Sequence, residues 1–149
     1  MMPKGEPKAR VDFGNCLFFS TAALSRRLTE FAEEEFSKIG LAPSHGFVLL
    51  LSLKDPGIQP SEIARQLSFK PSTITRFLDR LERDGLIERK SQGRSARIMP
   101  TNRAKSMEAA IRSAWKALYV RYSELLGKPL EQELTRDIAR AREVLDPKP

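Results

Sequence analysis

Apolar residues between positions 60 and 83 recur at intervals of three and four, the spacing of one face of a helix. The apolar positions are Ile63, Ala64 and Leu67 in a first set and Ile74, Phe77, Leu78 and Leu81 in a second. Residues 68–70 interrupt this spacing between the two sets and predict a tight turn, in which Phe69 can close over the first set. The pattern therefore predicts a short helix, a turn and a longer helix, that is, a helix-turn-helix over residues 60–85.

A β-hairpin is expected directly after the second helix. Asp84-Gly85 ends that helix, because glycine readily adopts the left-handed C-cap conformation. Residues 86–90 and 95–99 are strand candidates on either side of a turn at residues 91–94, and Pro100 suits the end of a strand. The hairpin would form a wing over residues 86–100 of a winged helix-turn-helix spanning residues 41–101.

Helical patterns flank this centre on both sides. Residues 15–40 predict a long amphipathic helix with Asn15 as its N-cap, and Pro43 begins a helix that is apolar nearly all round. Residues 102–146 predict two further helices, whereas residues 1–13, with two prolines and a glycine, predict a flexible arm. The expected fold class is mainly α with a small β-hairpin, a winged helix-turn-helix with additional N- and C-terminal helices in one domain.

Composition narrows the function classes. The 149 residues include 26 Lys or Arg and 19 Asp or Glu, so the formal net charge of +7 favours a polyanionic partner. With one cysteine and one histidine, we expect no metal site, no cofactor and no catalytic centre. No run of eighteen apolar residues and no signal-peptide pattern occurs, so we expect a cytoplasmic protein without a membrane partner.

The positive charge is concentrated where the helix-turn-helix and wing are predicted, since residues 54–103 hold eleven Lys or Arg and six Asp or Glu. Arg76 is the candidate for a bidentate contact to guanine, and Arg94 at the hairpin tip for the minor groove. Arg83 is expected to pair with a neighbouring acid instead. The predicted DNA-binding residues are Ser61, Lys70, Pro71, Ser72, Thr73, Thr75, Arg76, Arg80, Lys90, Arg94 and Arg97.

The segments PSEIARQLSFKPSTITRFLDRLERDGLIERK and GRSARIMPT, preceded by GLAPSHGFVLLLSL, resemble the MarR (multiple-antibiotic-resistance regulator) family of dimeric winged-helix transcription factors. The resemblance covers about residues 15–145. It implies a homodimer on a pseudo-palindromic operator in double-stranded DNA, a repressor released by a small-molecule signal, in which the helices of residues 15–40 and 102–146 interdigitate with a second subunit. The implied dimerisation residues are Leu17, Phe18, Leu24, Leu130, Leu134, Ile138 and Leu145.

The sequence departs from the family pattern in the wing and at three helix starts. Gln92 stands where the family commonly has an acidic residue, two positions before the wing arginine, and the wing is a few residues shorter. Ala42, Gln59 and Lys70 occupy positions where helix caps are often Ser or Thr.

A signal for release is implied only by the resemblance. Members of the family often bind phenolic or aromatic anions between the dimerisation helices and the winged helix, and the candidate crevice residues here are Phe31, His45, Phe47 and Trp115. Each of these four is more simply explained as a plain core residue.

Two other hypotheses stay open. One branch of the family senses organic hydroperoxides through a cysteine near the start of the first helix, and Cys16 lies two residues before the sensor position that an alignment on Ser25-Arg26 assigns to Phe18. Cys16 would make the protein a thiol-based redox regulator. The alternative from another class is a winged-helix protein-interaction module without DNA binding, against which the basic, hydroxyl-rich outer face of the second helix argues.

Overall fold

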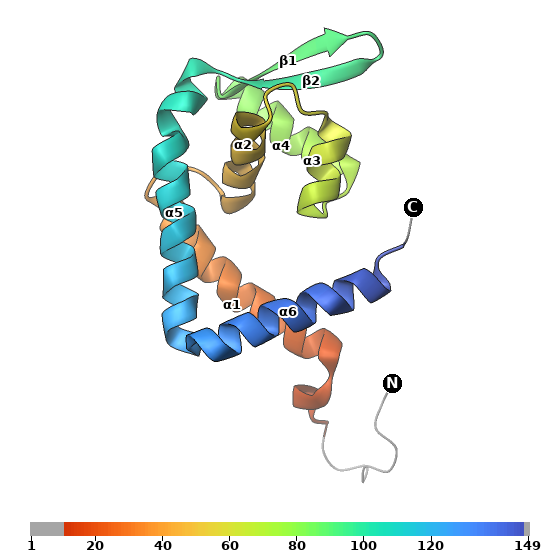
Figure 1. Ribbon diagram of the computed structural model, residues 1–149, viewed down its shortest axis with the longest axis vertical. Helices are drawn as coiled ribbons and strands as arrows, with labels where there is room; N and C mark the ends of the chain where they lie inside the picture. The colour runs from red at the N-terminus through yellow and green to blue at the C-terminus, as the bar shows by residue number, and fades with distance from the viewer. Residues whose placement is uncertain (1–10, 148–149) are drawn as a thin grey trace.

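The computed structural model describes residues 11–147, which form six α-helices, one 3-10 helix and a two-stranded antiparallel sheet (Figure 1). The elements are η1 (Phe13–Asn15), α1 (Leu17–Ser37), α2 (Pro43–Lys54), α3 (Pro60–Leu67), α4 (Pro71–Arg83), β1 (Ile87–Gln92), β2 (Ser95–Pro100), α5 (Asn102–Leu126) and α6 (Lys128–Leu145). Of the arm expected at residues 1–13, residues 1–10 lie outside the described residues, and Phe13 belongs to η1.

Proline begins three helices of the winged-helix region, where its missing N–H costs nothing. Their N-caps Ala42, Gln59 and Lys70 make no side-chain capping hydrogen bond. Helix α5 is capped instead by Thr101, whose Oγ1 accepts from the N–H of Ala104 at 3.2 Å. In these helices the fixed φ of proline replaces part of what a capping side chain would contribute.

The prediction that Asn15 caps the first helix is wrong. The Asp12 carboxylate accepts from the N–H of Gly14 at 2.8 Å and starts the 3-10 turn η1, so Asn15 becomes the last residue of that turn. Cys16 is the N-cap of α1, without a side-chain hydrogen bond.

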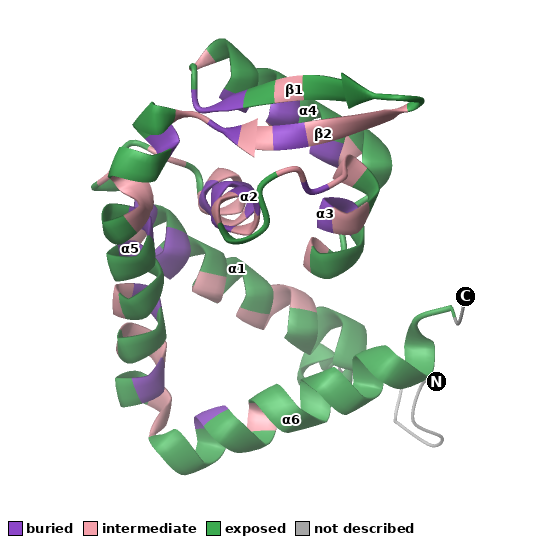
Figure 2. Cartoon of the chain, turned by 45° about the horizontal axis from the view of Figure 1, so that its top comes forward, coloured by how far each residue is buried: buried purple, intermediate pink, exposed green. Residues whose placement is uncertain are grey.

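The core surrounds α2, which contacts α1, α3, α4, β2 and α5. Figure 2 shows the buried surfaces of α2, α4 and β2 turned towards one another. Val48 and Leu49 of α2 are fully buried, as is Phe36 of α1. Gly46 lies so close to Phe36 that a Cβ at this position would overlap Cε1 of the ring. The absence of a side chain at Gly46 therefore sets how closely α1 and α2 approach.

The wing is a hairpin with a two-residue turn. Gln92 pairs with Ser95 and Ile87 with Pro100, and Gly93 in the turn has a φ of 65°. The strands are each shifted or extended by one or two residues relative to the prediction, and Pro100 lies at the end of its strand, as expected. At the base, the N–H of Ile98 donates to the carbonyl of Ile58 at 3.0 Å, so the loop between α2 and α3 anchors the hairpin to the core.

Helix α5 runs from the base of the wing to α6, and α1, α5 and α6 together form a frame beside the winged helix (Figure 1). Phe31, Ala32 and Leu118 form a second, smaller cluster that joins α1 to α5. The guanidinium carbons of Arg27 and Arg121 lie 4.5 and 4.2 Å from the centroid of the Phe31 ring. Phe31 is thus enclosed between two cations and fixes the contact of the two helices.

Candidate nucleic-acid interface

Helix α4 buries one face and leaves the other in solvent. Ile74, Leu78 and Leu81 pack into the core. The exposed residues of the opposite face are Ser72, Thr75, Arg76, Asp79 and Arg80, with Thr73 half-buried at its edge. The exposed N-terminal turns of the helix therefore carry hydroxyls and a guanidinium, groups that can hydrogen-bond base edges and phosphates.

The arginines of α4 differ in what holds them. Arg80 Nε donates to Asp84 Oδ2 at 3.0 Å, whereas Arg76 and Arg83 form no ion pair with any residue between 11 and 147. The expectation that Arg83, rather than Arg80, pairs with an acid is therefore wrong. Glu82 and Asp79, the other acids of this helix, are already engaged by Arg89. Arg76 keeps an unpaired guanidinium on the exposed face.

Arg89 of β1 was missed by the sequence reasoning, yet it joins the wing to α4. Its guanidinium donates to Asp79 Oδ1 at 2.7 Å, to Glu82 Oε1 at 2.9 Å and to the carbonyl of Thr75 at 3.3 Å. The backbone N–H of Arg89 also donates to Glu82 Oε2 at 3.3 Å. The spacing of Asp79 and Glu82, three residues apart on one helix face, was the available signal. Arg89 fixes the hairpin against the helix that would enter a groove.

Two cations lie opposite each other in the middle of the wing. Lys90 and Arg97 are cross-strand partners, so both side chains point to the same face of the hairpin. Arg97 Nη1 donates to the carbonyl of Gly57 at 3.3 Å, and its Nε is buried without a hydrogen-bond partner. Like charges directly opposite are unfavourable unless an anion lies between them. This face of the hairpin therefore suits a phosphate group.

The remaining predicted DNA-binding residues belong to α3, to the start of α4 and to the wing, which lie together at one end of the molecule (Figure 1). Ser61 is exposed in the first turn of α3, Lys70 and Pro71 are exposed at the start of α4, and Arg94 is exposed in the turn of the hairpin. The structure thus gathers residues from α3, α4 and the wing on one basic end.

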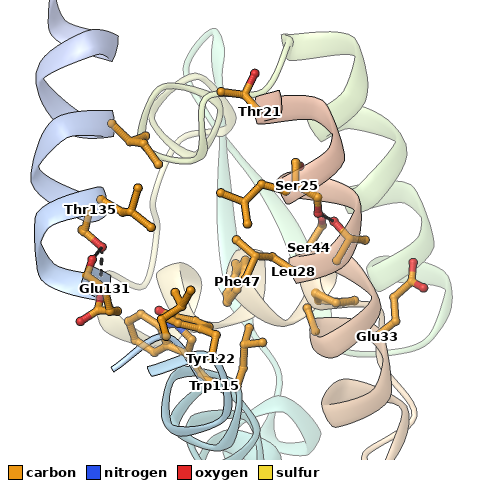
Figure 3. A pocket seen from close by; sticks show the side chains of 18 of the residues that line it. Thr21, Ser25, Leu28, Glu33, Ser44, Phe47, Trp115, Tyr122, Glu131 and Thr135 are labelled. Atoms are coloured by element: carbon orange, nitrogen blue, oxygen red, sulfur yellow. Dashed lines mark hydrogen bonds between the residues drawn. The ribbon is translucent and has the colours of Figure 1, made fainter. Parts of the chain in front are cut away.

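A cavity of about 760 Å³ lies between α1, α2, α5 and α6 (Figure 3). Of the four candidate residues of the effector crevice, Phe47 and Trp115 line this cavity, whereas Phe31 and His45 do not. Phe31 is buried between its two arginines, as described above. His45 packs on Phe77 of α4, with ring centroids 5.0 Å apart, and burial lowers its pKa, with Arg80 adding to the effect and Asp84 opposing it.

The cavity is apolar with a few polar groups. Glu131 of α6 is only 6% exposed, and its Oε1 accepts from Thr135 Oγ1 at 3.1 Å. Burial raises the pKa of Tyr122, and the nearby charge of Glu131 raises it further, followed by Tyr119. The Tyr122 hydroxyl therefore stays protonated beside this carboxylate.

The predicted dimerisation residues are left uncovered in the single chain. Leu17 is 73% exposed and Phe18 is 82% exposed. Leu130, Ile138 and Leu145 are exposed too, whereas Leu24 and Leu134 are half-buried and line the cavity. Cys16, at the start of the same exposed region of α1, is a free and exposed cysteine.

Comparison with known proteins places these features in a family. A sequence model of the MarR family matches residues 43–99, from α2 to β2. The transcriptional repressor MdtR of Bacillus subtilis (strain 168) is 30% identical over 110 residues, which cover 72% of this chain and 71% of MdtR. The chain belongs to the MarR family. The repressor YetL of the same organism is 33% identical over 88 residues, and this match spans about half of YetL, 53% of its length.

Solved structures extend the likeness to nearly the whole chain. The transcriptional repressor CouR bound to p-coumaroyl-CoA is 26% identical, with a TM-score of 0.79 over 90% of this chain and 99% of CouR. CouR bound to a 23-mer DNA duplex is likewise 26% identical, with a TM-score of 0.74 over 89% of this chain and 99% of CouR. The MarR-type winged-helix fold therefore includes α1, α5 and α6 as well as the matched centre.

Neither a membrane-spanning helix nor a cluster of metal-binding side chains occurs within residues 11–147. None of the helices described there is both long and apolar enough to cross a membrane. Within the same residues, no group of three or more His, Cys, Asp or Glu side chains is placed to hold a metal ion.

Proposed function

We propose that this MarR-family protein is a homodimeric, sequence-specific DNA-binding transcriptional regulator, and more narrowly a repressor of a pseudo-palindromic operator. The observation that carries the proposal is the exposed N-terminal half of α4, where Arg76 has no ion-pair partner within residues 11–147. The DNA-bound structure of CouR, a relative of the same fold, supports it.

Within this proposal α4 enters the major groove and the wing follows the backbone. Arg76 forks onto a guanine, while Ser72, Thr73 and Thr75 bond phosphates or base edges. Lys90 and Arg97 receive a phosphate between them, and Arg94 extends from the hairpin tip towards the minor groove. Ser61 and Lys70 add backbone contacts at the starts of α3 and α4.

The second subunit supplies the other recognition helix. Exposed Leu17 and Phe18 on α1 and exposed Ile138 and Leu145 on α6 are large apolar residues that an isolated subunit would leave in water. Their burial between two copies would hold two α4 helices at the distance of successive major grooves, about 34 Å apart. Phe18→Glu should therefore give a monomer in analytical ultracentrifugation and abolish operator binding. The control variant Val120→Glu on α5 should remain dimeric and bind the operator. A dimeric Phe18→Glu protein would count against this interface.

Release from DNA is proposed to follow binding of a small, largely apolar molecule in the cavity. The cavity is walled both by α1, α5 and α6 of the dimer frame and by α2 of the winged helix. A ligand there would bind one arrangement of these elements better and shift the population towards it, changing the distance between the two α4 helices. The complex of the relative CouR with p-coumaroyl-CoA supports a small-molecule signal.

Selection from a random DNA pool tests the DNA-binding proposal most directly. We expect enrichment of one sequence with two-fold symmetry and half-sites about one helical turn apart. Binding to random duplex should be weaker and should fall steeply between low and moderate salt. Failure to bind any duplex at low salt would favour the rival reading, a winged helix that serves as a protein-interaction module.

A thiol signal is the second candidate, favoured only by the exposure of Cys16 at the N-terminus of α1. Operator binding by wild type and Cys16→Ser, each with and without peroxide, decides between the signals. Release of the wild type alone would establish the redox role, and equal release of both proteins would exclude it.

A further inference from the structure

The polar groups of the cavity are acidic or neutral. Two carboxylates, those of Glu33 and Glu131, line it together with hydroxyls that include those of Ser25, Tyr122 and Thr135. Among the described residues that line the cavity there is no Lys, Arg or His. An anionic ligand would find no cationic partner in this lining.

Glu131 is the decisive residue, because its side chain is largely buried in the lining of the cavity and accepts few hydrogen bonds. A carboxylate can accept about four hydrogen bonds, and the contact from Thr135 Oγ1 at 3.1 Å is the one side-chain hydrogen bond that Glu131 receives within residues 11–147. No ion pair joins it to a cation of these residues either. A buried charge is normally paired, since burial without a partner is costly. Its position in the first turn of α6 favours a negative charge through the helix dipole.

Aromatic rings line the same cavity as this carboxylate. Phe47 and Trp115 meet edge to face with centroids 6.2 Å apart, and Tyr122 lies with them beside Glu131 (Figure 3). The faces of aromatic rings attract ammonium groups, and the rings also accommodate an apolar body. The volume of about 760 Å³ lies in the range of cavities that hold drug-sized molecules.

We propose that the ligand of this cavity is an apolar organic cation, an amine whose ammonium group donates to Glu131 while its hydrocarbon or aromatic body packs on Trp115 and Phe47. This inference rests on the proposed function, in which a molecule in this cavity releases the protein from DNA. It replaces the aromatic anion that family resemblance implied, because a ligand carboxylate would lie next to a buried carboxylate without a neutralising residue. The half-buried Leu24 and Leu134 line the cavity and are also predicted dimerisation residues, so a second subunit would lie beside it.

Three compounds with one skeleton test the charge preference in the intact dimer. These are 4-phenylbutylamine, 4-phenylbutan-1-ol and 4-phenylbutyrate, which are cationic, neutral and anionic at pH 7. Trp115 is the one tryptophan of the chain, so quenching of its fluorescence on excitation at 295 nm reports binding beside its ring, and the effect of changing Glu131 assigns that binding to this cavity. We expect the amine to bind about tenfold more tightly than the alcohol, and the anion to bind more weakly than both.

The variant Glu131→Gln keeps the shape of the side chain and removes its charge. It should lower the affinity for the amine about tenfold and leave the affinity for the alcohol nearly unchanged. Glu33→Gln is the matched control, because that carboxylate also lines the cavity but is exposed; it should change the amine affinity about twofold or less. The ranking of the three compounds on the wild type needs no variant and stands even if Glu131→Gln fails to fold.

Opposite outcomes overturn the inference. The proposed cation preference fails if the anion binds as tightly as the amine, or if Glu131→Gln leaves the amine affinity unchanged. It also fails if no compound quenches Trp115, the result expected if the second subunit or one of its cations fills the cavity. Operator binding by the ligand-free protein is measured on the same samples. Intact operator binding together with a preference for the anion would refute this inference alone, whereas absence of operator binding would refute the proposed function and leave the compound ranking valid.

Discussion

Arg89 holds the wing against the recognition helix, and its removal should weaken both stability and DNA binding. Arg89→Ala deletes the contacts to Asp79 and Glu82 and the longer one to the Thr75 carbonyl. It also leaves two carboxylates without their partner at the surface that would face DNA phosphates. The perturbation therefore acts on the angle between β1 and α4 and on the local charge.

The expected loss of stability follows from the exposure of the groups involved. The Arg89 side chain is 26% exposed, while those of Asp79 and Glu82 are 53% and 44% exposed. Exposed ion pairs contribute about 0.2–1 kcal/mol each, because solvent screens them, and the half-buried guanidinium places the total near the upper end. We expect the free energy of unfolding to fall by about 1–2 kcal/mol, which for a chain of this size lowers Tm by roughly 3–6 °C.

Chemical denaturation and fluorescence anisotropy measure the two effects, at one protein concentration because dimer stability depends on it. DNA affinity should fall about tenfold, as the hairpin is released and the carboxylates repel phosphates. Arg89→Lys should restore only part of either loss, since an ammonium cannot reproduce the fork of a guanidinium. Arg83→Ala is the stability control, expected within about 0.5 kcal/mol of wild type. A stability of Arg89→Ala equal to that of wild type would refute the assigned role.

Three further outcomes are expected. Arg76→Ala should lower the discrimination between operator and random duplex by about 1–3 kcal/mol in binding titrations, whereas Arg97→Ala should weaken both alike; equal losses for Arg76→Ala would remove its base-reading role. Gly46→Ala should lower the free energy of unfolding in urea by about 1–2 kcal/mol. The new Cβ would overlap the buried Phe36 ring, and this overlap should outweigh the gain in helix propensity of about 1 kcal/mol. An unchanged urea midpoint would show that the ring can move. The pKa of His45 is lowered in the folded state, so the unfolded state binds the proton more tightly. The free energy of unfolding should therefore fall as the pH drops from the ordinary histidine pKa of about 6.5 towards the lower pKa of the folded state. His45→Gln should remove this pH dependence in unfolding measurements, and an identical pH profile in the variant would disprove the assignment to His45.

Local chemistry in the sequence accounts for much of the fold. The three-and-four spacing around Ile74 and Leu78 determines which face of α4 is buried, and therefore that Arg76 is exposed. Gly93 and Pro100 mark the turn and the end of the hairpin, and Pro43 marks the start of α2. These features follow from the sequence because each depends on the conformational preferences of neighbouring residues and on the periodic burial of one face.

Pairing between distant residues was decided by tertiary structure alone. Arg83 has Asp79 one helical turn before it, but Arg89 reaches Asp79 and Glu82 from a neighbouring strand, so Arg83 is left without an ion pair among the described residues. The same holds for the cavity, where α1, α2, α5 and α6 meet and Glu131 becomes buried although its helix is otherwise largely exposed. Periodicity shows which side of a helix is apolar, but the partner of a charged side chain is determined by how whole helices pack, and that packing brought Glu131 into a cavity that Phe47, Trp115 and Tyr122 also line.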